Sequence, residues 1–123
     1  MVGQKVLELC FHHGFVTLGG DLVLLVDKES VKATLRAHEP ELRSSGILHL
    51  HLHGSVVRGE AGPFSDVDLA AVFDRNKIRS PLAEIRLARE LSVLLGATVD
   101  LANETTLKAD VRANFEREAE FVF

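Results

Sequence analysis

The chain has 123 residues, of which 46% are hydrophobic and 26% charged, and its formal net charge is −4. This length fits one domain, and the composition is that of a globular protein rather than a disordered or fibrous one. The acidic balance argues against a surface that neutralises many phosphates, so we expect no nucleic-acid partner.

Cysteine content and apolar run length predict where the protein works. Cys10 is the single cysteine, so no intrachain disulfide can form and the chain suits a reducing compartment. Apolar runs such as Leu22–Val26 are far shorter than the ~20 residues that span a bilayer. The N-terminal stretch contains Glu8 and is a poor match to a secretory signal. We therefore expect a cytoplasmic protein with no membrane partner.

Residues 1–26 differ in character from the rest of the chain. Some helical spacing is followed by a Gly-Gly turn and a short apolar run with strand character. We interpret 1–26 as an N-terminal extension and 27–123 as the domain. The domain begins with a predicted helix, which Asp27 or Ser30 caps, Pro40 bends and Gly46 ends.

Two strands are predicted after this helix. Residues 47–53 alternate strictly between leucine and histidine after the first position, as a half-buried strand does. We expect Leu48, Leu50 and Leu52 on the core face, and His49, His51 and His53 on the other. The second strand starts near Ser65, and its core face would carry Val67, Leu69, Ala71 and Phe73.

The remaining elements complete an α/β (α+β) pattern. Ser80 and Pro81 start a helix that runs to Gly96. Residues 97–103 predict a third strand, Thr105 or Thr106 starts another helix, and residues 120–123 form a last strand. This order predicts a small mixed β-sheet with helices on one face and the other face open. The apolar side of the first of these helices would be formed by Leu82, Ile85, Ala88, Leu91 and Leu95.

The second strand carries two carboxylates that would point away from the core. Residues two apart in a strand project from the same face, so Asp66 and Asp68 lie side by side with α-carbons roughly 6.6 Å apart. Two like charges held together favour a cation between them, and magnesium is bound by one or two carboxylates plus substrate phosphates. Asp-x-Asp also occurs in solvated loops, so the pair alone is weak evidence for a metal site.

Gly54-Ser55 and Asp100 strengthen the magnesium interpretation. Between a strand end and a short helix, glycine and serine can bring backbone N–H groups and a hydroxyl to a phosphate. Asp100 lies between Val99 and Leu101, so it should emerge on the same open face as Asp66 and Asp68. Three carboxylates on adjoining strands are the equipment of two-metal phosphoryl transfer, with Asp100 placed to accept a proton from an incoming hydroxyl.

These residues resemble a known signature. Gly54-Ser55, ten intervening residues, Asp66-Val67-Asp68 and the later Asp100 resemble the pattern of the DNA polymerase beta-like nucleotidyltransferase superfamily. More narrowly, "LHLHGSVVRGEAGPFSDVDLAAVFD" and the ending "EREAEFVF" resemble the minimal nucleotidyltransferases (MNT), the antitoxins of HEPN/MNT toxin–antitoxin pairs. The similarity covers about residues 27–123.

The resemblance implies a nucleotidyltransferase fold, ATP as cosubstrate, two Mg²⁺ ions and a HEPN toxin as partner. AMP would be transferred to a tyrosine hydroxyl of the toxin, which silences its ribonuclease activity. The chain itself contains no tyrosine, so it cannot be its own tyrosine acceptor.

The same resemblance assigns roles to individual residues. Gly54 and Ser55 would hold the triphosphate, Asp66 and Asp68 would bind both metals, and Asp100 would bind the catalytic metal and act as base. We also place Arg58 and Ser65 in the nucleotide-binding group, with a surface or structural role as the alternative for Arg58.

Two departures from the family leave alternatives open. His53 stands where the family usually has a bulky apolar residue, and the stripe of His49, His51 and His53 could bind a transition metal. Otherwise the stripe is a half-polar surface or lies under a helix or partner. The extension 1–26 is longer than usual, and it could shield the sheet edge, bind the partner or lack a function.

Three functions therefore follow from the sequence. The first is an adenylyltransferase that modifies the HEPN toxin. The second is a non-catalytic antitoxin that binds the toxin through apolar surface such as Phe121 and Phe123. The third is a nucleotidyltransferase that acts on a different hydroxyl acceptor.

Overall fold

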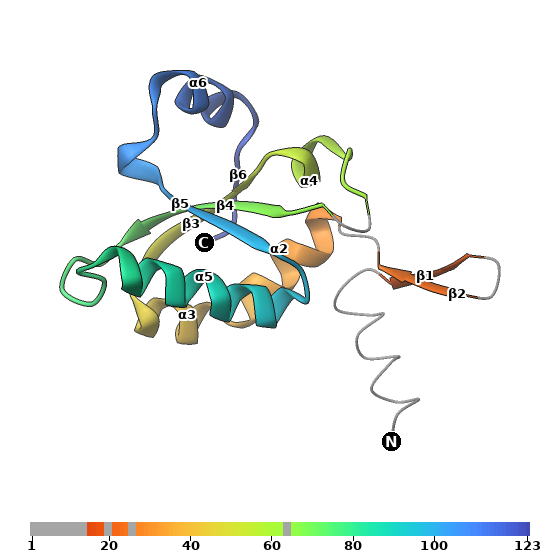
Figure 1. The fold of residues 1–123 in the computed structure, drawn as a ribbon, viewed down its shortest axis with the longest axis horizontal. Helices are drawn as coiled ribbons and strands as arrows, with labels where there is room; N and C mark the ends of the chain where they lie inside the picture. The colour runs from red at the N-terminus through yellow and green to blue at the C-terminus, as the bar shows by residue number, and fades with distance from the viewer. Residues whose placement is uncertain (1–14, 19–20, 25–26, 63–64) are drawn as a thin grey trace.

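A computed structural model describes residues 15–18, 21–24, 27–62 and 65–123, and Figure 1 shows its fold. A four-stranded mixed sheet has the order β5-β4-β3-β6, and a separate two-stranded sheet pairs β1 with β2. The strands are β1 (Phe15–Leu18), β2 (Asp21–Leu24), β3 (Ile47–His53), β4 (Val67–Phe73), β5 (Val99–Asn103) and β6 (Glu120–Phe121). The helices are α2 (Lys28–Ala37), α3 (Glu39–Ser45), α4 (Ser55–Arg58), α5 (Pro81–Leu95), the 3-10 helix η1 (Glu104–Thr106) and α6 (Ala109–Glu118).

The extension predicted over residues 1–26 is only partly described. Its strand-like apolar run contains β2, which pairs antiparallel with β1. The helical spacing predicted upstream of β1 lies outside the described residues. The boundary between extension and domain stays a prediction.

The helix predicted over residues 27–46 is divided into α2 and α3. Asp27 caps α2, since its side chain accepts a hydrogen bond from the Ser30 N–H at 2.9 Å. The chain leaves the helical path at His38, and Pro40, which has no N–H to donate, sits in the first turn of α3. Gly46 ends α3 with a left-handed φ of 118°. The predicted bend near Pro40 is therefore a full break.

The buried face of β3 differs from the prediction at the first two residues of the strand. Leu50 and Leu52 are fully buried as expected, but Leu48 is 41% exposed and Ile47 is buried in its place. The pairing of β3 with β4 shifts register between Ile47 and His49. An extra residue at such a bulge reverses the alternation on one side of it, so the predicted core position of Leu48 is wrong.

The buried faces of β4 and α5 agree only in part with the sequence. Val67, Leu69, Ala71 and Phe73 are buried in β4, as predicted. Ser80 caps α5, accepting from the Ala83 N–H at 3.2 Å. Leu82 and Ile85, however, are 55% and 58% exposed, and the buried residues of α5 are Leu87, Leu91 and Leu95. β5 is the last strand of the sheet. The side of α5 that extends past β5 therefore has no strand against which to pack.

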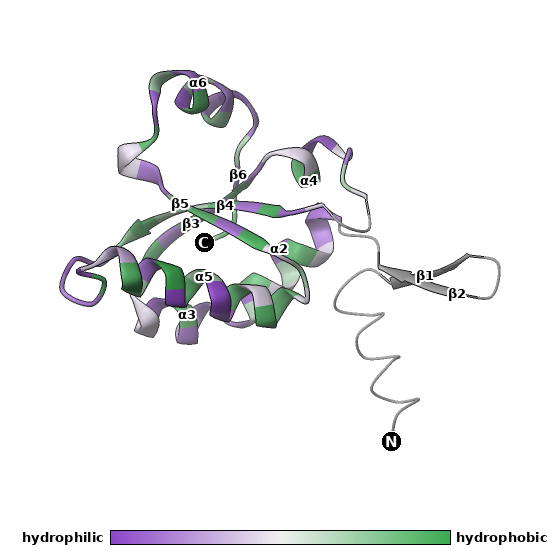
Figure 2. Cartoon of the chain, viewed as in Figure 1, coloured by the Kyte–Doolittle hydropathy of each residue, from purple (hydrophilic) through white to green (hydrophobic). Residues whose placement is uncertain are grey.

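The helices form layers against the sheet. α2, α3 and α5 lie along one face of the sheet, while α4 and α6 lie on the opposite side (Figure 1). Hydrophobic residues, green in Figure 2, recur along the strands and along the helices of the first layer. The predicted fold class, a small mixed sheet with helices, is confirmed. The second face is less open than expected because α6 stands over part of it. None of the described helices is long and apolar enough to cross a bilayer.

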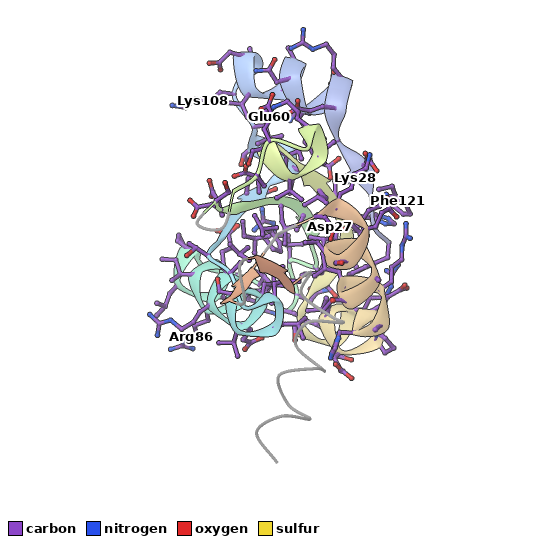
Figure 3. All side chains as sticks on the ribbon, turned by 90° about the vertical axis from the view of Figure 1, so that its right-hand side faces the viewer. Asp27, Lys28, Glu60, Arg86, Lys108 and Phe121 are labelled. Carbon is purple, nitrogen blue, oxygen red and sulfur yellow. The ribbon has the colours of Figure 1, made fainter. Side chains whose placement is uncertain are left out.

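The last strand is held to the sheet by both backbone and side chains. β6 pairs with β3, and the two carboxylate oxygens of Glu120 lie 2.9 Å from Lys28 Nζ and 2.7 Å from Lys32 Nζ. Figure 3 shows Lys28 and the exposed Phe121 on this side, with Lys108 and Arg86 at opposite ends of the molecule. Phe123, by contrast, is buried in the core at 4% exposure.

Candidate active site

Strand register brings the predicted carboxylates to one face of the sheet. Asp68 in β4 pairs with Asp100 in the parallel strand β5 and with His53 in the antiparallel strand β3. Residues paired in register point to the same side of a sheet, so Asp68 and Asp100 are neighbours. Asp66 stands one residue before β4 and adds its charge to the field at Asp68. The structure therefore gathers all three predicted aspartates at the C-terminal end of β3 and the N-terminal ends of β4 and β5.

Asp68 lies deepest of the three. Partial burial raises the pKa of the Asp68 carboxyl above its ordinary value, His53 opposes this shift, and the charges of Asp100 and Asp66 add to it. Asp66 and Asp100 are exposed. The shift arises because ionised Asp68 loses water and faces like charges. A cation at this point would relieve both costs.

The Gly54 turn lies directly against Asp68. Gly54 has φ 78° and ψ −153°, a conformation that residues with a Cβ rarely adopt. A Cβ built on Gly54 would collide with Asp68 Oδ2 and lie 2.9 Å from Asp68 Cγ. Glycine is therefore needed both for the backbone turn and for the close approach of the carboxylate. Ser55 follows as the first residue of α4.

The other two predicted nucleotide-binding residues already have protein partners. Arg58 Nε lies 2.8 Å from Glu60 Oε2, and Arg58 Nη1 donates to both oxygens of Glu118 at 3.0 and 3.1 Å. These carboxylates raise the pKa of Arg58 further. Ser65 Oγ accepts a hydrogen bond from the Gly62 N–H at 2.8 Å, which closes the loop before Asp66.

Glu118 is a site residue that the sequence did not reveal. Its Oε1 accepts a hydrogen bond from the Gly54 N–H at 3.2 Å in addition to the contacts with Arg58. Glu118 ends α6, 64 residues after Gly54, and no local pattern relates the two. It lies in the segment "EREAEFVF" on which the family resemblance partly rested.

His51 and His53 of the histidine stripe lie under α6, whereas His49 is exposed and lies near Phe121 of β6. Phe115 of α6 packs edge-on against His51 and His53, with ring centroids 5.5 Å apart in each case. His51 Nδ1 lies 3.0 Å from Glu104 Oε2, although the geometry is not that of a hydrogen bond. His53 Nε2 is buried without a hydrogen-bond partner. For His51 and His53 the structure supports a position under a helix, and the exposed His49 fits the half-polar surface.

The donor set at the aspartates suits a hard divalent cation. Within the described part of the chain, no three His, Cys, Asp or Glu side chains are arranged as a ready-made metal cluster. Asp66, Asp68 and Asp100 nevertheless offer only carboxylate oxygens, the ligands that magnesium prefers, and leave room for substrate phosphates. The raised pKa of Asp68 is consistent with a group whose countercharge is supplied by a ligand.

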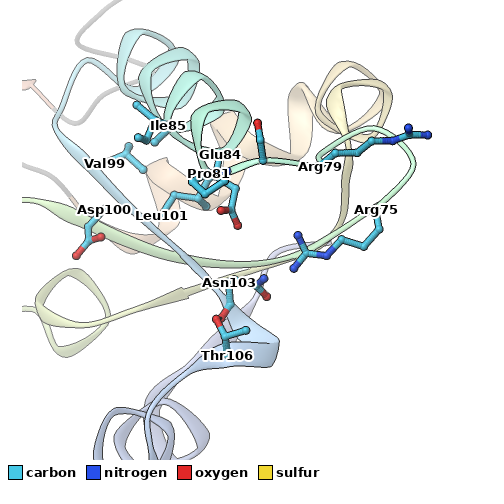
Figure 4. A pocket seen from close by; sticks show the side chains of 12 residues that line it. Arg75, Arg79, Pro81, Glu84, Ile85, Val99, Asp100, Leu101, Asn103 and Thr106 are labelled. Atoms are coloured by element: carbon cyan, nitrogen blue, oxygen red, sulfur yellow. The ribbon is translucent and has the colours of Figure 1, made fainter.

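A cavity of about 650 Å³ lies next to these carboxylates, along the outer side of β5 (Figure 4). Asp100 belongs to its lining, together with residues of α5 and of the β4–α5 connection. The lining residues are Arg75, Arg79, Ser80, Pro81, Glu84, Ile85, Ala88, Val99, Asp100, Leu101, Asn103 and Thr106.

Comparison with known proteins identifies the family. Residues 35–122 match the model of the nucleotidyltransferase domain. The protein adenylyltransferase MntA of Thermococcus cleftensis is 39% identical over 95 residues, which cover 76% of this chain and 94% of that protein. The chain belongs to the nucleotidyltransferase-domain family, and the resemblance seen in the sequence is confirmed.

Solved structures agree with this assignment. A structure provisionally described as a minimal nucleotidyltransferase superposes with a TM-score of 0.63 at 34% identity, over 77% of this chain and 95% of that chain. The complex of a tri-AMPylated Shewanella oneidensis HEPN toxin with an MNT antitoxin matches with a TM-score of 0.56 at 17% identity, over 75% and 71% of the two chains. At 17% identity the second match supports the fold alone.

Proposed function

We propose that this chain is an adenylyltransferase antitoxin, which transfers AMP from ATP to a tyrosine hydroxyl of a cognate HEPN toxin. The proposal is supported by family membership, by the relative named protein adenylyltransferase MntA, and by a similar fold in a complex with an AMPylated HEPN toxin. It acts in the cytoplasm, where ATP is available. The catalytic unit is the segment 27–123.

The observation that carries the proposal is the pairing of Asp68 with Asp100, beside Asp66 and against the Gly54 turn. The Ser55 N–H and hydroxyl would bind the triphosphate, and the Gly54 N–H would do so once it exchanges its hydrogen bond to Glu118. Ser65 shapes the loop that enters β4. Arg58 reaches a phosphate only after it exchanges its ion pairs with Glu60 and Glu118.

The three aspartates would hold two magnesium ions, which neutralise charge on the triphosphate when bound. Asp100, the most accessible from the side of β5, accepts the proton of the tyrosine hydroxyl. The tyrosine oxygen forms a bond to the α-phosphorus of ATP, the bond between that phosphorus and the α–β bridging oxygen breaks, and diphosphate leaves. AMP remains on the tyrosine.

A labelling assay tests the proposal. Incubation with ATP labelled in the α-phosphate, magnesium and the cognate HEPN toxin should place label on the toxin. The changes Asp66→Asn and Asp68→Asn should each remove it because they take away a metal ligand. Asp100→Asn should remove it as well, since general-base catalysis alone contributes about 10²–10⁴-fold. Asp110→Asn, an exposed carboxylate on α6, is the matched control and should keep full activity. Full labelling by the three site variants would refute the proposal.

A second candidate is a non-catalytic antitoxin that binds the toxin. The observation in its favour is Phe121, which is 55% exposed on the edge strand β6. The sequence also suggested Phe123 for this surface, but Phe123 is buried, so that part is wrong. Neutralisation of the toxin that survives Asp66→Asn but is lost with Phe121→Asp would favour binding. Transfer to a different hydroxyl acceptor would appear as label on a molecule other than the toxin.

A further inference from the structure

We propose that the groove along the free edge of β5 binds an extended segment of the acceptor protein as an additional strand, which sets the acceptor hydroxyl against Asp100. This inference rests on the proposed function and adds to it the place and the form in which the acceptor is recognised.

Strand β5 has an edge without a strand neighbour among the described residues. It ends the sheet order β5-β4-β3-β6, and its only strand neighbour is β4 within the described chain. The Val67 N–H donates to the Thr98 carbonyl at 2.8 Å. Because alternate residues of a parallel strand bond to the same neighbour, Thr98, Asp100 and Ala102 turn their backbone groups toward β4. Val99 and Leu101 turn theirs toward the free edge.

A second hydrogen bond confirms this assignment of directions. The Val99 N–H donates to Ser92 Oγ of α5 at 3.0 Å, on the side away from β4. The outward backbone groups of Leu101 come next along the edge. They are the groups to which an added strand would pair, as in other complexes where an extended peptide joins an exposed sheet edge.

The cavity follows this edge. Val99, Asp100 and Leu101 are consecutive and face alternate sides of the sheet, yet all three line the cavity. A space that touches both sides of one strand must run along the edge of that strand. Its inner wall is the apolar side of α5, where Ile85 is 58% exposed although it was predicted to be buried. An added strand would cover this apolar wall.

The two ends of the groove carry opposite charges. Asp100 lies at its catalytic end, and Figure 4 shows Arg75 extending toward the end of β5 that carries Asn103. Among the described residues neither Arg75 nor Arg79 forms an ion pair; Arg75 lies over the Phe73 ring and Arg79 Nε donates to the Asn76 carbonyl. The two arginines thus remain available to an anion.

These observations define the occupant. It is an extended polypeptide segment whose acceptor residue lies beside Asp100 and whose acidic side chain lies about three residues away, roughly 10 Å along the strand. The acidic side chain faces Arg75, which extends toward this end of β5 (Figure 4). Nucleotide would occupy the other side of the aspartates, at the Gly54 turn.

Two groove variants test the proposal in the labelling assay with the cognate toxin. Ile85→Glu places a charge on the apolar wall. Leu101→Pro removes the outward N–H, a change that edge strands tolerate because the ladder to β4 is not involved. We expect each variant to raise the KM for the toxin about tenfold, the effect of one or two lost interactions, while the Kd for ATP with magnesium, measured by titration, stays unchanged. Leu82→Glu is the matched control, since Leu82 is equally exposed on α5 but does not line the cavity.

Each outcome decides between the alternatives. An unchanged KM for the toxin in both groove variants would overturn the groove while leaving the proposed function intact. A weakened Kd for ATP in Ile85→Glu would show that the groove holds nucleotide, which also overturns the inference. Absence of transfer by the unmodified chain would refute the proposed function itself, and the groove with it.

Discussion

At the scale of single residues, Gly54 is constrained twice, by its backbone conformation and by the carboxylate that faces it. The ladder of β4 fixes Asp68 beside the Gly54 turn, and Asp68 leaves no space for a side chain at position 54. The Gly54 turn and Asp68 are therefore packed as one unit.

This packing predicts the cost of adding one methyl group. Gly54→Ala should lower the free energy of unfolding by at least about 2 kcal/mol, because strained φ/ψ values cost roughly 1–3 kcal/mol and the contact with Asp68 adds to this. Urea unfolding measures the difference. The control is Gly59→Ala. Gly59 also has a positive φ, of 73°, but a Cβ added there would have no atom within 4 Å. Equal losses for the two variants would show that the contact with Asp68 is unimportant.

The raised pKa of the Asp68 carboxyl leads to a prediction about how stability depends on pH. Its pKa is raised in the folded chain, so ionisation opposes folding, and this penalty grows as the pH rises from the ordinary value of 3.8 through the folded value. Asp68→Asn removes the penalty. Without metal, its melting temperature should exceed that of the unmodified chain at pH 7 and equal it near pH 3. A lower melting temperature of Asp68→Asn at pH 7 would contradict the prediction, and Asp110→Asn serves as control.

At the scale of elements, α6 connects the C-terminal part of the chain to the Gly54 turn. Phe115 packs on the histidines of β3, and one turn later Glu118 receives the Gly54 N–H and the Arg58 guanidinium. The helix thus positions the turn through one buried ring and one carboxylate.

Removing the charge of Glu118 should weaken its contacts with the Gly54 N–H and Arg58 and so lower stability. Glu118→Gln is expected to lower the free energy of unfolding by about 1 kcal/mol, a value reduced from that of a buried charged hydrogen bond because the pair is partly exposed. Added salt should shrink the difference. Glu116→Gln, on the exposed side of α6, provides the comparison in urea unfolding. A loss of the same size in Glu116→Gln would mean that the contacts of Glu118 contribute nothing specific.

The sequence predicted the elements more accurately than their buried faces. Strong local signals, such as the Asp27 and Ser80 caps and the alternation in β4, are confirmed because they depend on neighbouring residues only. Leu48 and Ile85 were placed wrongly because a bulge and the end of the sheet are set by distant strands.

At the scale of the whole molecule, the sheet separates two tasks. One face builds the apolar core with α2, α3 and α5, and the other carries the aspartates, the Gly54 turn and α6. The sequence predicted that the three aspartates point away from the core because alternation follows from the hydrophobic pattern. Their grouping also required β4 and β5 to be neighbours, which the pairing of the two strands shows. It could not predict that Glu118 and the groove of β5 complete the site, since these depend on how the chain returns to the sheet.

The alternation along β4 also links the position of Asp68 to the burial of its apolar neighbours. Val67 and Leu69 lie in the core on either side of Asp68, and a shift of one residue in the pairing would bury the carboxylate and expose both apolar side chains. A molecule with this shifted pairing would therefore be less stable than the native one. A chain that folds with Val67 and Leu69 in the core therefore also carries Asp68 on the opposite face, so the register that stabilises the fold also assembles the candidate site.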